Sequence, residues 1–558
     1  MSPSPTSQSF LALGRSSASP PSSSYKIDSF SDAVHRKPCS STSLDLSNEA
    51  TTLCHSDSER AGHSQQDIED VTGGCTTHVG APGKKWEALL AYMFFFVLGS
   101  SFLLPWNSLL VSTTYFGSRL ARHRFQFSYM NWITVVFTIA NVLFISSATS
   151  TQQSVKHPTI RIIVSLLLIT SLSVILLTST QYTNLDSSQF FGFLIVVTLF
   201  EALGSAYLQT SVIGLSAWFG SNYLQAILSG QGAIGVLVSV VQLLVNINEL
   251  NSSSDPANPD GAADHIRQSS STFFGLCTAF CVLALVCFMT LLQLPIYQEA
   301  MQRKHAARKV LPDSLEYEDS VVQPLLSSSS SSSVDQVSEN AHLPIPVGPK
   351  LRVVERKIRL LGLSIFYNFF ITLAVFPSIT GFILSSHDPA HAHIGLLTTA
   401  TSSVDSSGSD SRLLLDNWYK PSIFIPLHFV VFNLGDWAGR VLPQLLPRFS
   451  KRLSHRTSAL YTLSAARTVF IPMFLVCNVD YSSIVLFRSD LIYLVILACF
   501  SISNGYLSAL LMVAGLEEPS LEADEIDLAA TCMSFYLTSG LAAGSLISFA
   551  VKAIVFIL

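Results

Sequence analysis

Long apolar segments recur along this chain from residue 88 to residue 555 and constrain its fold more than any other feature. A helix needs about 20 apolar residues to cross the hydrocarbon core of a membrane, which is about 30 Å thick. Segments of that length lie at 88–111, 127–148, 160–180, 189–217, 223–248, 272–294, 359–384, 420–445, 458–477, 490–513 and 527–555. Charged residues make up only 12% of the chain, about half their share in soluble globular proteins. These features predict an all-α polytopic membrane protein with eleven transmembrane helices.

Two polar stretches divide the chain into parts. Residues 1–87 are rich in Ser, Pro, Thr and Asp and have few large apolar side chains, so they predict a disordered cytoplasmic tail. Residues 295–358 have basic ends and a serine-rich middle, which predicts a flexible cytoplasmic loop. This loop separates an N-terminal six-helix bundle at 88–294 from a C-terminal five-helix bundle at 359–558.

Basic residues in short loops predict the orientation of the helices. The runs "QRKHAARK" (302–309) and "RFSKRLSHR" (448–456) favour the cytoplasm for both of their loops. "RLARHR" (119–124) then lies on the far side and argues against this orientation. The N-terminus is expected in the cytoplasm and the C-terminus outside the cell or in a lumen, in a plasma or a vacuolar or lysosomal membrane. Asn251, in Asn251-Ser252-Ser253, falls on the outer side and is a candidate glycosylation site.

Several classes of function are not indicated. The net charge is only -5, and no basic stretch interleaved with aromatic residues predicts nucleic-acid binding. The cysteines show no C-x-x-C spacing for zinc, and His387, His391 and His393 are better explained as a solvated loop than as metal ligands. No G-x-S-x-G or H-E-x-x-H motif occurs. We therefore expect no enzyme activity, no metal and no cofactor.

Asp436 and Arg440 stand inside the predicted eighth helix, in "VFNLGDWAGR" (431–440). Each charge costs about 2.5–3.5 kcal/mol at the centre of a membrane helix, so such residues predict a functional site. Their spacing of four places both side chains on one helix face, where they can form an ion pair. Asp436 can accept hydrogen bonds from hydroxyl groups and Arg440 can donate to oxygens, a combination suited to a neutral ligand such as a sugar ring. The alternative is a structural ion pair that holds this helix against a neighbour.

Uncharged polar residues accompany aromatic ones in two other predicted helices. "LLPWNSLL" (103–110) places Trp106 and Asn107 after a proline, and the indole offers a flat face to a planar ligand. "FEALGSAYLQT" (200–210) places Gln209 on the face of Glu201, where its amide can recognise a heterocycle. The alternatives are a membrane-interface anchor for Trp106 and an interhelical hydrogen bond for Gln209.

Two glycine motifs are best explained by helix packing. "GQGAIG" (230–235) satisfies the G-x-G-x-x-G pattern, but no strand precedes it and the surrounding apolar run is too long for a dinucleotide-binding unit. We expect its glycines, and those of "GLAAG" (540–544), to allow close contact between helices.

Several motifs, taken in order, resemble those of the equilibrative nucleoside transporter family. They are "LPWN" (104–107), "YLQ" (207–209), "LSGQG" (228–232), "FP" (376–377), "FNLGDWAGR" (432–440), "RTVFIPMFLVCN" (467–478) and "SNGYLSALLM" (503–512). The resemblance covers about residues 88–555, and the serine-rich tail and loop are similar to those of a fungal or other microbial member. It implies a 6+5 arrangement similar to the major facilitator superfamily, with two bundles that rock around a central site.

The resemblance also implies roles for individual residues. Trp106 would line the cavity near the nucleobase, Gln209 would bind the base, and Asp436 with Arg440 would hold the ribose hydroxyls. Asn107 and Asn433 would be their neighbours, and Arg467, at one end of the ninth helix, and Asp527 would help to close the cytoplasmic side. Two departures are Glu201, a candidate proton-sensitive carboxyl, and Gly435, which would widen the site.

These inferences predict a facilitative carrier of nucleosides, with nucleobases as a second substrate class, that works as a monomer in the lipid bilayer. One alternative is a proton-linked nucleoside carrier. Another is a sensor or scaffold that binds nucleosides without transporting them and signals through its long cytoplasmic segments.

Overall fold

The computed structural model describes residues 82–121, 124–126, 128–152, 158–182, 185–252, 259–319, 347–387, 418–478 and 485–555. All of these residues belong to the unit His78–Leu558. The predicted tail up to residue 81 lies outside the described residues. Within the described part of this unit, regular structure is helical apart from one isolated bridge between Cys477 and Phe487.

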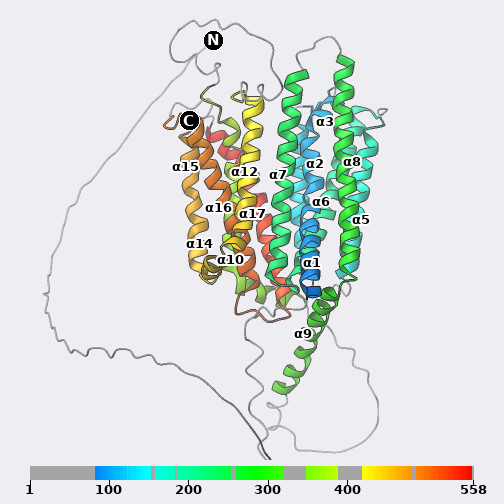
Figure 1. Cartoon of the computed structure of the whole chain (residues 1–558), viewed down its shortest axis with the longest axis vertical. Helices are drawn as coiled ribbons and strands as arrows, with labels where there is room; N and C mark the ends of the chain where they lie inside the picture. The colour runs from blue at the N-terminus through cyan, green and yellow to red at the C-terminus, as the bar shows by residue number, and fades with distance from the viewer. Residues whose placement is uncertain are drawn as a thin grey trace, which may run out of the picture. The chain divides into compact units, whose positions relative to one another are not determined.

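The helices follow one another in the order predicted (Figure 1). They are α1 (Pro82–Ser101), α2 (Leu104–Val111), α3 (Thr113–Arg119), α4 (Tyr129–Ser150), α5 (Pro158–Ser179), α6 (Ser187–Ala217), α7 (Ser221–Ser252), α8 (Pro259–Leu291), α9 (Pro295–Asp319), α10 (Val347–Val375), η2 (Thr380–Phe382), α12 (Pro421–Leu445), α13 (Pro447–Ser454), α14 (Thr457–Ala466), η4 (Arg467–Val469), α15 (Phe470–Leu475), α16 (Asp490–Leu516) and α17 (Ile526–Val555). We call α1 to α8 the N-half and α10 to α17 the C-half.

Each predicted apolar segment forms helix, although the number of membrane crossings stays a prediction. In the described ranges, nine spans are long and apolar enough to cross a membrane. The bent pair α1 and α2 raises this number to ten. The eighth predicted segment forms α12, which has 25 residues but is not in this group.

Three predicted helices are broken. The seventh leaves the α-helix after Val375, where α10 ends, and a turn leads to η2. The first bends by 41° between α1 and α2, where Pro105 cannot donate a backbone hydrogen bond to the preceding turn. The ninth consists of α14, the short 3-10 helix η4 and α15. Arg467 is the first residue of η4, so it lies in the middle of this span rather than at one end as the sequence analysis expected.

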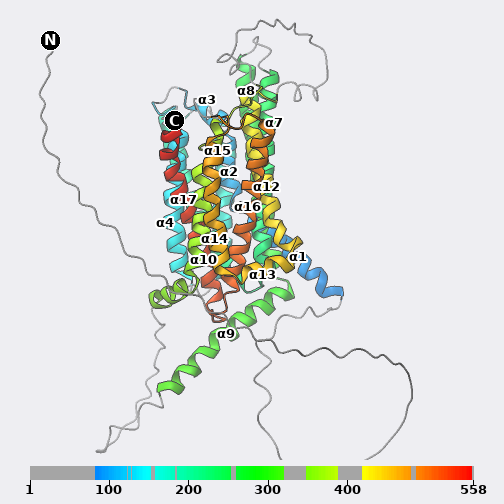
Figure 2. The same cartoon turned by 90° about the vertical axis from the view of Figure 1, so that its left-hand side faces the viewer.

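The predicted flexible loop 295–358 is helical at both ends. Helix α9 begins at Pro295, a residue favoured at the first position of a helix, and α10 begins at Val347. Residues such as Glu, Ala, Met, Gln, Arg and Lys fill α9 and have high helix propensity, which the loop prediction overlooked. Residues 320–346 lie outside the described part. Figures 1 and 2 place α9 beyond one end of the helices, which we call the α9 end, and we call the other the opposite end.

Glycines allow close packing at the contact between the halves, as predicted. Helix α7 packs against α12, and a Cβ at Gly232 would lie 2.9 Å from the ring of Trp437. Within the C-half, a Cβ at Gly544 of α17 would lie 2.9 Å from the Cβ of Leu373 in α10. Larger residues would push these helices apart.

The buried apolar residues form a shared core at the α9 end and separate cores at the opposite end. The largest cluster takes residues from both halves, including Trp218 and Leu224 with Leu510 and Leu528. A second cluster, around Phe424, contains only residues of the C-half. Three others contain only residues of the N-half. The two halves therefore share one apolar core only at the α9 end, among the residues that the structure describes.

Candidate functional site

Asp436 and Arg440 form the ion pair that the sequence predicted. The Nε of Arg440 lies 2.8 Å from the Oδ2 of Asp436, one helical turn away in α12. The two residues are only 6% and 8% exposed, so each charge needs its partner and further hydrogen bonds to be stable there.

Both members of the pair also bind neighbouring helices. The Nδ2 of Asn504 in α16 donates to the Oδ1 of Asp436 at 2.6 Å. The NH1 of Arg440 donates to the Oε1 of Gln231 at 3.1 Å and to the carbonyl oxygen of Leu228 at 3.4 Å, both in α7. The pair thus joins α12 to α16 within the C-half and to α7 of the N-half.

Arg467 extends this polar network inside the C-half. Its NH1 donates to the Oδ1 of Asn368 at 2.7 Å and to the Oδ1 of Asn504 at 3.2 Å. Thr372 accepts from the same nitrogen at 2.8 Å, and the guanidinium lies 4.6 Å from the centre of the Phe500 ring. The structure therefore connects Arg467 to Asp436 through one side chain, that of Asn504.

Glycines let α16 approach this network closely. A Cβ at Gly505 would lie 2.9 Å from the backbone nitrogen of Arg440. A Cβ at Gly435 would lie 3.0 Å from the Cβ of Ser501. Gly435 thus faces α16 and permits its close contact with α12, so the expectation that Gly435 widens the site is wrong.

The other predicted ligand residues have partners of their own. The indole of Trp106 stacks on Phe137 of α4, with the ring centres 4.1 Å apart and the planes at 18°. The Nδ2 of Asn107 donates to the carbonyl oxygen of Leu103 at 2.9 Å, and that of Asn433 donates to Phe429 at the same distance. Both asparagines are therefore bonded within their own segments.

Gln209 connects the two halves at a second place. Its Nε2 donates to the Oγ of Ser534 in α17 at 2.8 Å, and the residue is 7% exposed. This is the interhelical hydrogen bond that the sequence analysis gave as the alternative to base recognition. The structure does not link Gln209 to the Asp436 network by a hydrogen bond among the described residues.

Glu201 is the least satisfied acid in the part of the chain that the structure describes. It is 1% exposed, and neither carboxyl oxygen has a hydrogen-bond partner there. A buried carboxyl without partners is costly in its charged form.

Asp527 binds a lysine of α9. The Nζ of Lys304 lies 3.4 Å from the Oδ2 of Asp527 at the start of α17. It also lies 5.8 Å from the centre of the Trp218 ring. The side chains of Lys304 and Asp527 are 9% and 1% exposed, so this ion pair is buried at the α9 end.

A family model described as "Nucleoside transporter" matches residues 194–402 and 391–553. The chain belongs to this nucleoside transporter family. Equilibrative nucleoside transporter 1 of Rattus norvegicus is 27% identical over 509 residues, which cover 85% of this chain and 99% of that protein. Equilibrative nucleoside transporter 2 of Homo sapiens is also 27% identical, over 82% of this chain and 96% of its own. The chain is therefore an integral membrane protein of a transporter family and not an enzyme, as predicted.

Among solved structures, a major facilitator superfamily transporter in the outward conformation matches with a TM-score of 0.46 and 13% identity. The match covers 84% of this chain and 97% of that one. A proton:xylose symporter of the same superfamily matches with a TM-score of 0.45 and 12% identity. The assignment to the nucleoside transporter family rests on the sequence matches.

Sequence reasoning missed Asn504 and Gln231, although both lie in motifs that it quoted, "SNGYLSALLM" and "LSGQG". An amide inside an apolar segment was the available signal. It did not indicate which charged group each amide binds, because those contacts join residues more than 60 positions apart.

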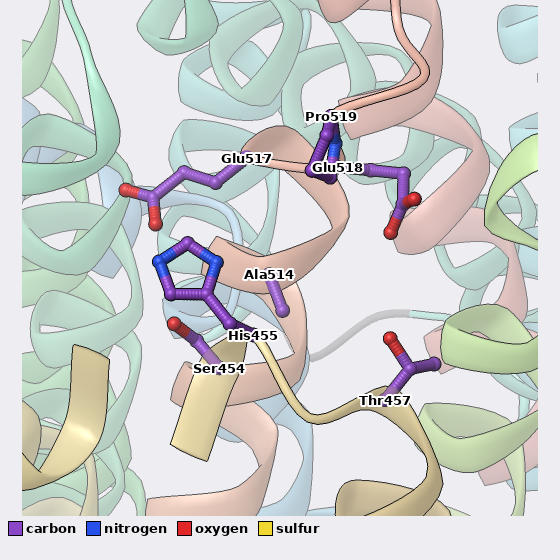
Figure 3. A pocket seen from close by; sticks show the side chains of 7 residues that line it. All are labelled: Ser454, His455, Thr457, Ala514, Glu517, Glu518 and Pro519. Carbon is purple, nitrogen blue, oxygen red and sulfur yellow. The ribbon is translucent and has the colours of Figure 1, made fainter. Parts of the chain in front are cut away.

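A pocket of about 230 Å³ lies elsewhere, at the α9 end of the C-half (Figure 3). It lies between the end of α13, the start of α14 and the turn after α16, and its lining residues are Ser454, His455, Thr457, Ala514, Glu517, Glu518 and Pro519. The imidazole of His455 points toward the side of the pocket that carries Glu517. None of the predicted ligand residues lines it.

Four further predicted residues lie at or beyond the edge of the described part. Asn251 is in the last turn of α7, and Ser253 of its acceptor sequence lies outside the described residues. The Nδ1 of His387 lies 3.1 Å from the Oδ2 of Asp490, whereas His391 and His393 are outside the described ranges. Among the described residues no group of three His, Cys, Asp or Glu is arranged to hold a metal.

Proposed function

We propose that this protein carries nucleosides across a membrane down their concentration gradient, with Asp436 and Arg440 as the ribose-binding residues. The observation that carries the proposal is the buried ion pair that joins α12 to both halves of the molecule. A carboxylate has about four acceptor positions, so Asp436 can accept from a ribose hydroxyl while it remains bonded to Arg440 and Asn504. The family match and the names of the relatives support nucleosides as the substrate class.

The base-binding residues in this proposal are Trp106 and Gln209. The ring of Trp106 already stacks on Phe137, and its second face would accept a planar base in the same way. The bond between Gln209 and Ser534 crosses the two halves, so its release would free the amide to bind the base. Asn107 and Asn433 are the proposed neighbours of these groups, and nucleobases are the second substrate class.

Alternating access is supported by the distribution of the core. The halves share a core at the α9 end, whereas the clusters of the opposite end belong to one half each. A carrier closed on one side would have this packing. We assign Asp527 to the closure of the α9 end because it binds Lys304 there. Arg467, the other predicted gating residue, has its hydrogen-bond partners inside the C-half, so we assign it to the support of the Asp436 network.

The α9 end is the cytoplasmic side in this proposal, because the basic residues that predicted the orientation lie in α9 and α13. The N-terminus would then lie in the cytoplasm, and the C-terminus outside the cell or in a lumen. The protein would act as a monomer in the plasma membrane or a vacuolar or lysosomal membrane.

A proton-linked carrier is the second candidate, and the burial of Glu201 favours it. Neither oxygen of this carboxyl has a hydrogen-bond partner in the described part of the chain, and the residue is 1% exposed. If the Glu201 carboxyl is neutral while it is buried and charged when the site opens to water, it would take up and release a proton in each transport cycle.

The test is uptake of labelled adenosine and uridine into liposomes that contain the purified protein, with and without an imposed proton gradient. Empty liposomes are the control. A facilitative carrier gives uptake that stops at equal concentrations on both sides. Uptake that follows the proton gradient, and loses that dependence in Glu201→Gln, would support the second candidate. Nucleoside binding without any uptake would contradict both and support a sensor.

A further inference from the structure

Asn504 holds a central place in the polar network of the C-half. It lies in α16, is 2% exposed, and its side-chain amide stands between Asp436 and Arg467. Its Nδ2 donates to the Oδ1 of Asp436 at 2.6 Å. Its Oδ1 accepts from Thr372 at 2.7 Å, from Asn368 at 3.0 Å and from Arg467 at 3.2 Å.

These partners permit only one orientation of the amide. A guanidinium only donates hydrogen bonds, and an ionised carboxylate only accepts them. If the amide were turned over, its NH2 group would face Arg467 and its oxygen would face Asp436, and both contacts would be repulsive. An amide nitrogen and oxygen are often hard to tell apart. In Asn504 the charges of Arg467 and Asp436 decide which atom is which.

The same arrangement fixes the carboxylate of Asp436. Arg440 holds one of its oxygens at 2.8 Å and Asn504 holds the other at 2.6 Å. A carboxylate bound at both oxygens cannot rotate freely, so its remaining acceptor positions have defined directions. Arg467, in contrast, has only neutral hydrogen-bond partners within the described residues. Its charge polarises the amide of Asn504 and strengthens the bond from that amide to Asp436.

We propose that Asn504 is a positioning residue that aims the Asp436 carboxylate at the ribose hydroxyls of the substrate. Asn504 does not contact the substrate itself. The role rests on the proposed function, because it needs Asp436 to bind ribose, and it makes Asn504 a determinant of the preference for ribonucleosides over deoxyribonucleosides.

The variant that tests this is Asn504→Asp, assayed as uptake of uridine, 2′-deoxyuridine and 3′-deoxyuridine into liposomes. The substitution keeps the shape of the side chain and gives Arg467 a charged partner, but it replaces the donor to Asp436 with an acceptor. We expect the KM for uridine to rise at least tenfold. We also expect the preference for uridine over the deoxynucleosides to fall at least fivefold, because Asp436 turns away from the hydroxyls.

Ser508→Ala is the matched control. Ser508 lies one turn further along α16, is also buried, and donates only to the carbonyl oxygen of Gly505 in its own helix, at 2.9 Å. The Ser508→Ala variant should have the same KM for uridine, and the same preference for uridine over the deoxynucleosides, as the unchanged protein. A change in Ser508→Ala as large as that in Asn504→Asp would attribute the effect to α16 packing and overturn the proposal.

A second variant, Thr372→Val, keeps the proposal testable if Asn504→Asp does not fold. It removes the hydroxyl that donates to the Oδ1 of Asn504 and accepts from Arg467, and it should lower the preference for uridine about twofold. An equal loss of uptake for ribo- and deoxyribonucleosides in either variant would overturn the positioning role. If the unchanged protein transports no nucleoside at all, the proposed function itself fails, and this result is distinguishable from the others.

Discussion

The two ends of the helix bundle differ in how they hold the halves together. At the α9 end, side chains of both halves fill one apolar core, and the buried pair of Lys304 and Asp527 joins α9 to α17. At the opposite end, each described cluster belongs to a single half. In the described part of that end, the side chain of Asn246 donates a hydrogen bond across the halves to the carbonyl oxygen of Ser422, and this bond is exposed. The contacts that a carrier must break to change its open side are therefore concentrated at the α9 end.

The Asp436 network lies where the shared core ends. Its C-half members are bonded to one another through Asn504 and Arg467, whereas Arg440 alone reaches α7 of the N-half. A ligand that binds Asp436 or Arg440 would act directly on this contact between the halves. Substrate binding and the movement of the halves would therefore be coupled through the guanidinium of Arg440, because this one group would bind the substrate and also contacts α7 of the N-half.

The largest effect is expected for Asp436→Ala, which removes the acid at this junction. The change leaves the buried guanidinium of Arg440 without its charged partner, a loss worth about 3–5 kcal/mol for a buried pair. Uptake of nucleosides into liposomes should fall at least tenfold at equal amounts of protein. Asp436→Asn, which keeps the shape, is the control for packing and should show a smaller loss of stability. Unchanged uptake in Asp436→Ala would assign the pair to helix attachment alone.

The sequence predicted the helices better than the contacts between them. Apolar length predicted most spans to within a turn or two, because it depends only on local composition and the thickness of a membrane. It did not predict the polar first turns of α8 and α10, which begin at Pro259 and Val347, before the predicted segments 272–294 and 359–384. The pairing of Asp436 with Arg440 was also predictable, since the two share a helix face. The partners of Arg467 were not, because Asn368 and Asn504 come from α10 and α16 and meet only in the folded bundle.

The breaks in helices were not predicted, although prolines lie beside them. Pro472 in "RTVFIPMFLVCN" cannot donate a backbone hydrogen bond to the carbonyl oxygen of Thr468 in η4, and Arg467 at this break donates to the carbonyl oxygen of Asn368. Glycine motifs did predict close approach. They did not reveal which helix approaches, so Gly435 was assigned to the site although it faces Ser501 of α16.

A second prediction concerns the ion pair that distinguishes the α9 end. Lys304→Met keeps most of the apolar stem and removes the charge, so Asp527 loses its ionic partner and the α9 end should open more often. Cys532, which lies in the shared core and is 4% exposed, reports this opening by its rate of maleimide labelling. In a variant with every other cysteine replaced, we expect that rate to rise about tenfold, equivalent to ~1.4 kcal/mol.

The opposite end supplies the control for this measurement. Cys477 is fully buried in the cluster that belongs to the C-half alone. In a second variant that keeps only Cys477, Lys304→Met should not change the labelling rate of this cysteine. The charge-swapped pair Lys304→Asp with Asp527→Lys should return Cys532 toward its original rate. If both cysteines became reactive together, the substitution would have loosened the whole protein, and the comparison between the ends would lose its support.

A third, smaller effect is expected at Trp106, in the N-half beyond the shared core. Trp106→Ala removes the ring that stacks on Phe137, and such aromatic pairs contribute about 0.5–1.5 kcal/mol beyond the apolar area they bury. The KM for adenosine should rise several-fold, and the rise in the KM for uridine should be about threefold smaller, because the larger base of adenosine offers more surface for stacking. Phe137→Leu controls for packing around the indole. An equal rise for both nucleosides would contradict a stacking role.

The smallest effect is expected for Asn246→Ala at the opposite end. The Nδ2 of Asn246 in α7 donates to the carbonyl oxygen of Ser422 in α12 at 3.1 Å, in an exposed position. A typical hydrogen bond contributes about 0.5–1.5 kcal/mol, and water can replace this exposed one, so uptake should stay within twofold. The labelling rate of Cys532 should not change, because this bond is remote from the shared core.

Gln444→Ala is the matched variant for the α9 end. Gln444 of α12 is hydrogen-bonded at 3.0 Å to Tyr92 of α1, also in an exposed position between the halves. The two substitutions therefore remove similar bonds from opposite ends, and only Gln444→Ala should raise Cys532 labelling, by less than twofold. A large effect of Asn246→Ala on uptake would mean that the halves are also held together at the opposite end, and the difference between the two ends would then lie in polar contacts rather than in the apolar core.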